Sequence, residues 1–105
     1  MNLLFVCSRN QWRSPTAEAI FKNHHEHQVQ SAGTEPSARI KITEKLINWA
    51  DLVFVMEKKH KQRLQQRFAD VITDKEIIIL DIPDDYQFMD EELVELLKIS
   101  VLPYL

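Results

Sequence analysis

A cysteine and an arginine near the N-terminus have the types and spacing needed for chemistry on an oxyanion. Cys7 ends an apolar run, Arg13 follows after five intervening residues, and Ser14-Pro15 opens a helical pattern. A loop between a strand and a helix can point backbone N–H groups at an anion, and the helix N-terminus adds its dipole. Arg13 can bind two phosphate oxygens with its planar guanidinium. The same positive field favours the nucleophilic thiolate of Cys7.

A free cysteine at the end of a buried strand is often no more than a small packing residue. That is the alternative for Cys7 taken alone. Arg13 and Ser14, at this spacing and in a strand–loop–helix setting, favour a reactive site instead.

The elements that must position these residues alternate along the chain. Strands are predicted at 3–6, 28–31, 52–56 and 77–80, and helices from residue 14 and at 43–50, 58–68 and 90–102. Apolar runs without alternation are typical of parallel strands covered on both faces, and strand–helix repeats give right-handed crossovers. We therefore predict one α/β domain over residues 1–105, a three-layer sandwich of about four parallel strands with helices on both faces. Cys7, Met56 and Asp81 then lie at or just past the carboxyl ends of strands, where ligands bind.

Several local expectations follow from individual residues or short segments. Ser14 is predicted to cap the first helix with Pro15 at its first position, and Thr43 to cap the second. Residues 32–34 are expected to turn the chain after the second strand. Gly33 is the single glycine, so its position is expected to need either a positive φ or a close backbone approach.

Composition excludes several classes of function. The net charge is −3, from 13 basic and 16 acidic residues, which argues against a nucleic-acid partner. No apolar run approaches the length that a membrane span needs, and residues 1–7 are too short for the apolar core of a signal peptide. A single cysteine permits no disulfide within the chain and favours a cytoplasmic location. The four histidines (His24, His25, His27 and His60) lack the spacing of a zinc site, so no metal and no cofactor are expected.

The chain strongly resembles the low-molecular-weight protein tyrosine phosphatase family along most of its length. The resemblance rests on the Cys-x5-Arg-Ser pattern after the first strand and on further matches at Asn10, at Pro15, Ala17 and Glu18, and over Ser31–Thr34 and Ala50–Met56. It implies the fold given above and hydrolysis of phosphate esters through a cysteinyl-phosphate intermediate. Cys7 is then the nucleophile, Arg13 the phosphate clamp, and Ser14 the hydroxyl that hydrogen-bonds Cys7.

This sequence departs from the family pattern at several positions. It is shorter between Thr34 and Thr43, where the family carries a longer excursion. Trp12 replaces a second loop cysteine, Arg9 replaces the loop glycine, and Gln11 stands where an aliphatic residue is common. The predicted phosphate-binding and substrate-binding set is Ser8, Arg9, Asn10, Gln11, Trp12, Ser14 and Tyr86.

The general acid that the family implies lies in the acidic segment after the fourth strand. Asp84 is preferred because the alignment then places Leu93 at the first apolar position of the last helix, whereas Asp81 would place the charged Asp90 there. A general acid protonates the leaving oxygen. The ordinary alternative is that these carboxylates only solvate a loop.

The predicted function is therefore a cysteine-dependent protein tyrosine phosphatase. Its expected partners are a phosphorylated protein or small phosphate ester, and inorganic phosphate or a similar oxyanion, with no nucleic acid and no membrane. Two alternatives stay open. One is arsenate reduction, which would need an external thiol because the chain has no second cysteine. The other is a non-catalytic binder of phosphorylated ligands.

Overall fold

The computed structural model describes residues 1–24 and 26–105. Nine named helices and strands and one closing turn of 3₁₀ helix follow one another within these ranges: β1 (Asn2–Cys7), α1 (Arg13–Phe21), β2 (Gln28–Gly33), α2 (Glu44–Trp49), β3 (Leu52–Val55), α3 (Lys58–Arg67), α4 (Ala69–Ile72), β4 (Glu76–Ile79), α5 (Glu91–Val101) and the 3₁₀ turn (Leu102–Tyr104).

The four strands form one parallel sheet in the order β2-β1-β3-β4. Cys7, the last residue of β1, is paired with Gly33 of β2, and Val6 is paired with Val55 of β3. The chain order reverses on the two sides of β1, so the loops after β1 and β3 meet at one edge of the sheet. Such a switch point is where open α/β sheets bind ligands.

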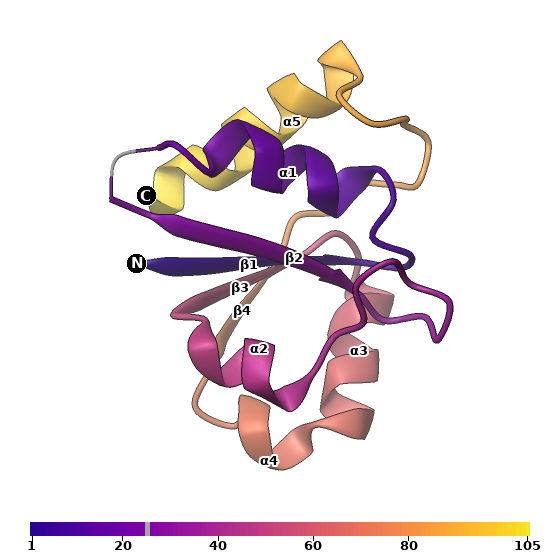
Figure 1. Cartoon of the computed structure of the whole chain (residues 1–105), viewed down its shortest axis with the longest axis vertical. Coiled ribbons are helices and arrows are strands. Elements are labelled where there is room, and N and C mark those ends of the chain that lie inside the picture. Colours follow the sequence, from indigo (N-terminus) through magenta and orange to yellow (C-terminus); the bar gives the residue numbers. More distant parts are fainter. Residues whose placement is uncertain (25) are drawn as a thin grey trace.

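Helices cover both faces of the sheet, as the sequence predicted (Figure 1). On one face α1 and α5 pack over Leu3 and Phe5, and on the other α2, α3 and α4 pack over Leu4 and Val6. These four apolar side chains of β1 are fully buried. Successive side chains of a strand point to opposite faces, so β1 supplies both cores and has no polar face.

Several local expectations need correction. Ser14 does not cap α1, because the helix begins at Arg13 and the Ser14 hydroxyl is used elsewhere. Ala32 and Gly33 belong to β2 rather than to a turn, and Gly33 has no positive φ. Thr43 does cap α2, accepting a hydrogen bond from the Leu46 backbone N–H at 3.2 Å. The four-residue α4 and the 3₁₀ turn were not predicted, because such short elements show no periodicity.

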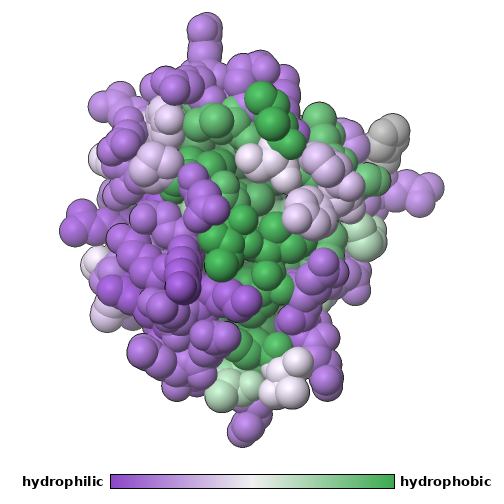
Figure 2. Space-filling view, turned by 180° about the vertical axis from the view of Figure 1, so that it is seen from behind, coloured by the Kyte–Doolittle hydropathy of each residue, from purple (hydrophilic) through white to green (hydrophobic). Residues whose placement is uncertain are grey.

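The far side of the molecule presents an apolar band between polar regions (Figure 2). β4 is the edge strand on that side, and its Ile77 and Ile79 are only partly buried. None of the described helices has the length and hydrophobicity needed to cross a bilayer.

Candidate active site

The loop from Cys7 to Trp12 folds around the sulfur of Cys7. The backbone N–H of Asn10 donates to Cys7 Sγ at 3.2 Å, and Ser14 Oγ lies 2.9 Å from the same sulfur. Cys7 is 3% exposed. The amide and the hydroxyl hold the sulfur in place at the centre of the loop.

Asn10 gives the loop its shape. Its φ is 55°, a left-handed conformation that asparagine tolerates better than most residues. Its Nδ2 donates to Ser14 Oγ at 2.8 Å and to Ser31 Oγ at 2.9 Å, and Ser31 in turn donates to Glu18. This buried chain joins β2, the loop and α1. It explains why the Ser14 hydroxyl faces Cys7 instead of capping the helix.

Gly33 allows the start of the loop to lie against β2. A Cβ at this position would lie 2.6 Å from the Ser8 carbonyl oxygen and 2.7 Å from Ala38 Cβ. The close approach that the sequence predicted is therefore the reason for glycine here, and the positive φ is not. The neighbouring backbone is held as well, since Glu35 N–H donates to Ser8 O at 2.8 Å.

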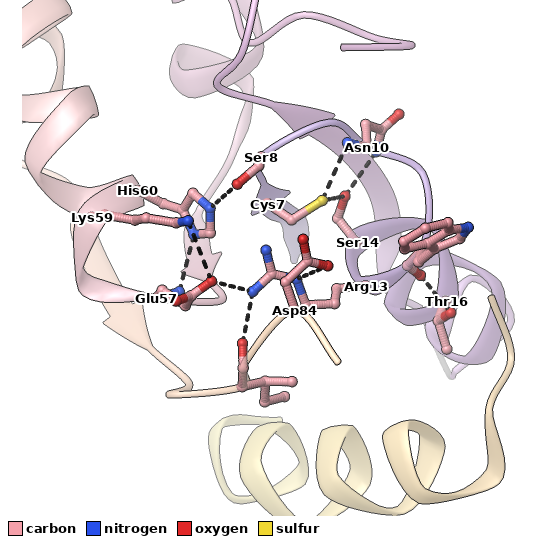
Figure 3. Close-up of polar contacts among 12 residues, drawn as sticks. Cys7, Ser8, Asn10, Arg13, Ser14, Thr16, Glu57, Lys59, His60 and Asp84 are labelled. Atoms are coloured by element: carbon pink, nitrogen blue, oxygen red, sulfur yellow. Dashed lines mark hydrogen bonds and ion pairs between the residues drawn. The ribbon is translucent and has the colours of Figure 1, made fainter. Parts of the chain in front are cut away.

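Arg13 is buried although it carries a charge. It is 2% exposed, and its Nη1 donates to Glu57 Oε1 at 2.5 Å and to the Ile82 carbonyl at 2.8 Å. Its Nε lies 3.6 Å from Asp84 Oδ1. The guanidinium lies between the carboxylates of Glu57 and Asp84 (Figure 3). A buried charge of this kind needs such partners, and they fix the orientation of its planar fork.

Glu57 and His60, at the start of α3, complete the surroundings of Arg13. Burial acts to raise the pKa of Glu57, but the hydrogen bond and charge of Arg13 outweigh it and hold that pKa below its usual value. Burial, with a smaller effect from the charge of Arg13, lowers the pKa of His60 to about 4. His60 Nδ1 lies 3.0 Å from the backbone N of Glu57, and its Nε2 lies 2.9 Å from Ser8 Oγ.

A cavity of about 380 Å³ opens above the sulfur. Its lining includes most of the predicted site together with two residues that the sequence reading missed: Cys7, Ser8, Arg9, Gln11, Trp12, Arg13 and Asp84 were predicted, whereas Glu35 and Lys59 were not. Trp12 is 42% exposed and forms part of the wall. Asn10 and Ser14 are fully buried behind Cys7, so their side chains support the loop and do not line the cavity.

Three residues of the acidic segment, Asp84, Asp81 and Tyr86, lie in different surroundings. Asp84 lines the cavity and approaches Arg13, whereas Asp81 borders a different hollow with Lys58 and Pro83. Tyr86 is not brought to the cavity. It packs against the core cluster beneath α5, and its hydroxyl donates to Glu92 at 3.4 Å.

Glu57 and His60 are functional candidates that sequence reasoning missed. Glu57 directly follows the third predicted strand (52–56), so its position at a strand end was a usable signal. His60 was considered in the sequence as a zinc ligand, and nothing in its spacing indicated the contact with Ser8. Within residues 1–24 and 26–105, no three His, Cys, Asp or Glu side chains are grouped to hold a metal ion; His25 lies outside the described residues.

This arrangement can bind a tetrahedral anion and attack it. Cys7 offers a sulfur nucleophile, Arg13 offers a guanidinium for the oxygens of the anion, and Asp84 adds a carboxyl group to the cavity lining. Donors fixed before the substrate arrives are the main source of stabilisation for the charge that develops in phosphoryl transfer.

Comparisons with known proteins identify the family that this chain resembles. The family model described as low molecular weight phosphotyrosine protein phosphatase matches residues 2–46. A protein-arginine-phosphatase from Bacillus subtilis (strain 168) is 33% identical over 140 residues, covering 93% of this chain and 93% of the relative. That alignment is longer than the 105 residues of this chain, so the relative contains additional residues within it.

Solved structures are similar over nearly the whole chain. A cysteine-to-serine mutant of the arginine phosphatase YwlE, with a phosphorylated active-site serine, is 27% identical with a TM-score of 0.73, covering 93% of this chain and 91% of that one. The tyrosine phosphatase Wzb from Escherichia coli K30, in complex with phosphate, has a TM-score of 0.79 at 21% identity, covering 98% and 94%. The second likeness supports the fold alone.

Proposed function

The chain belongs to the low-molecular-weight phosphotyrosine protein phosphatase family and is a cysteine-based protein phosphatase, and we propose that Cys7 is its nucleophile, Arg13 its phosphate clamp and Asp84 its general acid. One observation carries this assignment. Cys7 Sγ is held by Asn10 N–H and Ser14 Oγ at the floor of a cavity that the buried guanidinium of Arg13 also lines.

The reaction that these residues support has two steps. The Cys7 thiolate attacks phosphorus, so a P–S bond forms while the bond to the leaving atom breaks, and Asp84 gives its proton to that atom. The Asp84 carboxylate then takes a proton from a water molecule, which attacks phosphorus and releases phosphate and the thiolate. Arg13 and the loop N–H groups stabilise the phosphoryl oxygens in both steps.

Phosphotyrosine in protein is the first candidate substrate. The family description names it, and the exposed face of Trp12 at the cavity wall can stack on a phenyl ring. The proposed location is cytoplasmic, since the single thiol of the chain must stay reduced to act.

Phosphoarginine in protein is a second candidate, and a specific observation favours it. The mouth of the cavity carries the carboxylates of Glu35 and Asp84, which can pair with a guanidinium, and Gln11 adds a polar wall. The 33% identical relative is a protein-arginine-phosphatase.

Hydrolysis of a phosphotyrosine peptide and of an arginine-phosphorylated protein, each with Cys7→Ser as the blank, tests the proposal. Glu35→Gln should lower kcat/KM for the arginine substrate and leave the tyrosine substrate unchanged if the second candidate holds. Product formation from neither substrate would reject hydrolysis and favour the non-catalytic binder. Thiol-dependent turnover of arsenate would instead support the reductase.

A further inference from the structure

Ser8 and His60 form a hydrogen-bonded pair at the edge of the cavity. Ser8 Oγ lies 2.9 Å from His60 Nε2. Ser8 lines the cavity beside Cys7, whereas the His60 ring is fully buried at the start of α3. Figure 3 shows the imidazole directed at the Ser8 side chain. Neither side chain forms or breaks a bond in the two steps of the proposed hydrolysis.

The other ring nitrogen decides which atom of His60 carries the proton. Nδ1 lies 3.0 Å from the backbone N–H of Glu57, a group that can only donate, so Nδ1 must accept and is unprotonated. Burial keeps the ring neutral near neutral pH, since it lowers the pKa to about 4. The single proton of the neutral ring is therefore on Nε2, which donates to Ser8 Oγ.

This tautomer means that His60 is not a base for Ser8. A serine nucleophile needs a neighbour that accepts its proton, and Nε2 already carries one. Ser8 Oγ accepts from His60, so its own hydrogen is directed away from the imidazole. The serine cannot shift readily, because its carbonyl oxygen is held by Glu35 N–H at 2.8 Å and Gly33 packs against it.

We infer that Ser8 donates its hydroxyl hydrogen to an oxygen of the phosphoryl group bound over Cys7, and that His60 is the positioning residue that fixes this orientation. The inference rests on the proposed function, since it requires a phosphate in the cavity. A hydroxyl whose direction is set before binding loses less rotational freedom when the anion arrives. Hydrogen bonds to an anionic acceptor are among the stronger ones.

Two substitutions at His60 separate its contact with Ser8 from its contact with Glu57. In His60→Asn the amide oxygen replaces Nδ1, which keeps the acceptor for Glu57 N–H but removes the donor to Ser8. In His60→Gln the amide nitrogen replaces Nε2, which keeps the donor to Ser8. The probe is inorganic phosphate, with its dissociation constant measured by calorimetry on the full chain, so that turnover is not needed.

Ser8→Ala is expected to weaken phosphate binding about tenfold, the loss for one charge-assisted hydrogen bond. His60→Asn should weaken it to a similar extent, His60→Gln should restore most of the affinity, and the double variant Ser8→Ala/His60→Asn should be no weaker than Ser8→Ala alone. Wild-type affinity in Ser8→Ala, or additive losses in the double variant, would overturn the inference while leaving Cys7-dependent hydrolysis intact. Failure of the wild-type chain to bind phosphate would reject the inference and the proposed function together. Loss of hydrolysis in Cys7→Ser with phosphate binding retained would uphold the function independently of Ser8.

Discussion

Glu57 Oε1 lies 2.5 Å from Arg13 Nη1, so the second residue after the end of β3 holds the arginine that begins α1. Glu57 is separated from β3 by Met56 alone and precedes α3 directly. The contact therefore links the phosphate loop to the crossover from β3 to β4. Because Nη1 is shared between Glu57 and the Ile82 carbonyl, the plane of the guanidinium is fixed before any anion binds.

Arg13→Lys is expected to lower kcat/KM by more than about tenfold, or ~1.4 kcal/mol, although the charge is kept. A single ammonium cannot bind Glu57 and Ile82 and also grip two phosphoryl oxygens. Steady-state hydrolysis of an aryl phosphate measures the loss. Arg67→Lys is the matched control, since Arg67 donates to the Thr34 carbonyl and does not line the cavity. Equal effects of the two substitutions would mean that Arg13 is not the clamp.

Cys7→Ser is expected to abolish turnover while phosphate still protects the protein from thermal unfolding. The groups proposed to bind the anion are Arg13 and backbone N–H groups, and none of them is removed with the sulfur. A rise of the unfolding temperature with added phosphate reports binding without chemistry. Activity near the wild-type level in this variant would refute the mechanism.

Asp84→Asn is expected to lose about 10²–10⁴-fold in kcat on phenyl phosphate or phosphotyrosine, the usual effect of removing a general acid. The loss should be smaller on a nitrophenyl ester, because a good leaving group scarcely needs a proton. Rates on the two esters measure this difference. The basic limb of the pH–rate profile should also flatten.

Asp81→Asn and Asp85→Asn are the controls for that experiment, and neither should show the leaving-group dependence. If Asp81→Asn shows it instead, the acid lies three residues earlier and the mechanism still holds. If none of the three does, the chain has no general acid in this segment.

Gly33→Ala is expected to lower the free energy of unfolding by about 1–3 kcal/mol, the usual cost of forcing extra atoms into a packed site. The new Cβ would lie 2.6 Å from Ser8 O, a backbone atom that cannot move without displacing the loop. Urea unfolding measures the change. Adding Ala38→Gly removes only the 2.7 Å side-chain contact, so it should recover part of the stability and little of the activity. A fully stable and active Gly33→Ala would show that the loop is not held against β2.

His60 is expected to make stability fall as the pH falls from about 6.5 towards 4. Burial, and after it Arg13, lowers the folded-state pKa from 6.5 to about 4, so between these values the unfolded chain binds the extra proton. The contribution is at most about 3 kcal/mol. Urea unfolding at pH 7, 6 and 5 should show a smaller decline in His60→Asn than in the wild type. Identical declines would contradict a buried neutral His60.

Glu57 and Glu35 also make the stability depend on pH, but at lower pH than His60. The pKa of Glu57 is below its ordinary 4.5 because Arg13 outweighs burial, and that of Glu35 is lowered chiefly by its hydrogen bond from Arg63. Each carboxylate therefore contributes stability above pH 4.5, and this contribution is lost as the pH falls through the lowered pKa of the folded state. Both pKa values lie below 4.5, so this loss falls below the measured range of pH 5 to 7 and does not mask the contribution of His60.

The sequence by itself determined the sheet and the reactive loop, because both are encoded in neighbouring residues. The apolar runs around β1, β3 and β4 report burial on two faces, and Cys7, Arg13 and Ser14 lie within eight residues of one another. The sequence also predicted that position 33 needs glycine, but it left open whether a positive φ or a close backbone approach is the reason. Only the packed structure shows that the Ser8 carbonyl occupies the space a side chain would fill.

The tertiary structure alone decided which distant residues meet the loop. Glu57 and His60 reach Arg13 and Ser8 across more than forty positions, and Asp84, which the sequence alignment preferred, lines the cavity whereas Asp81 does not. Hydrophobic periodicity specifies which face of a helix is buried but not which polar atom it meets there. Those contacts depend on strand order and crossover geometry, which no local pattern records.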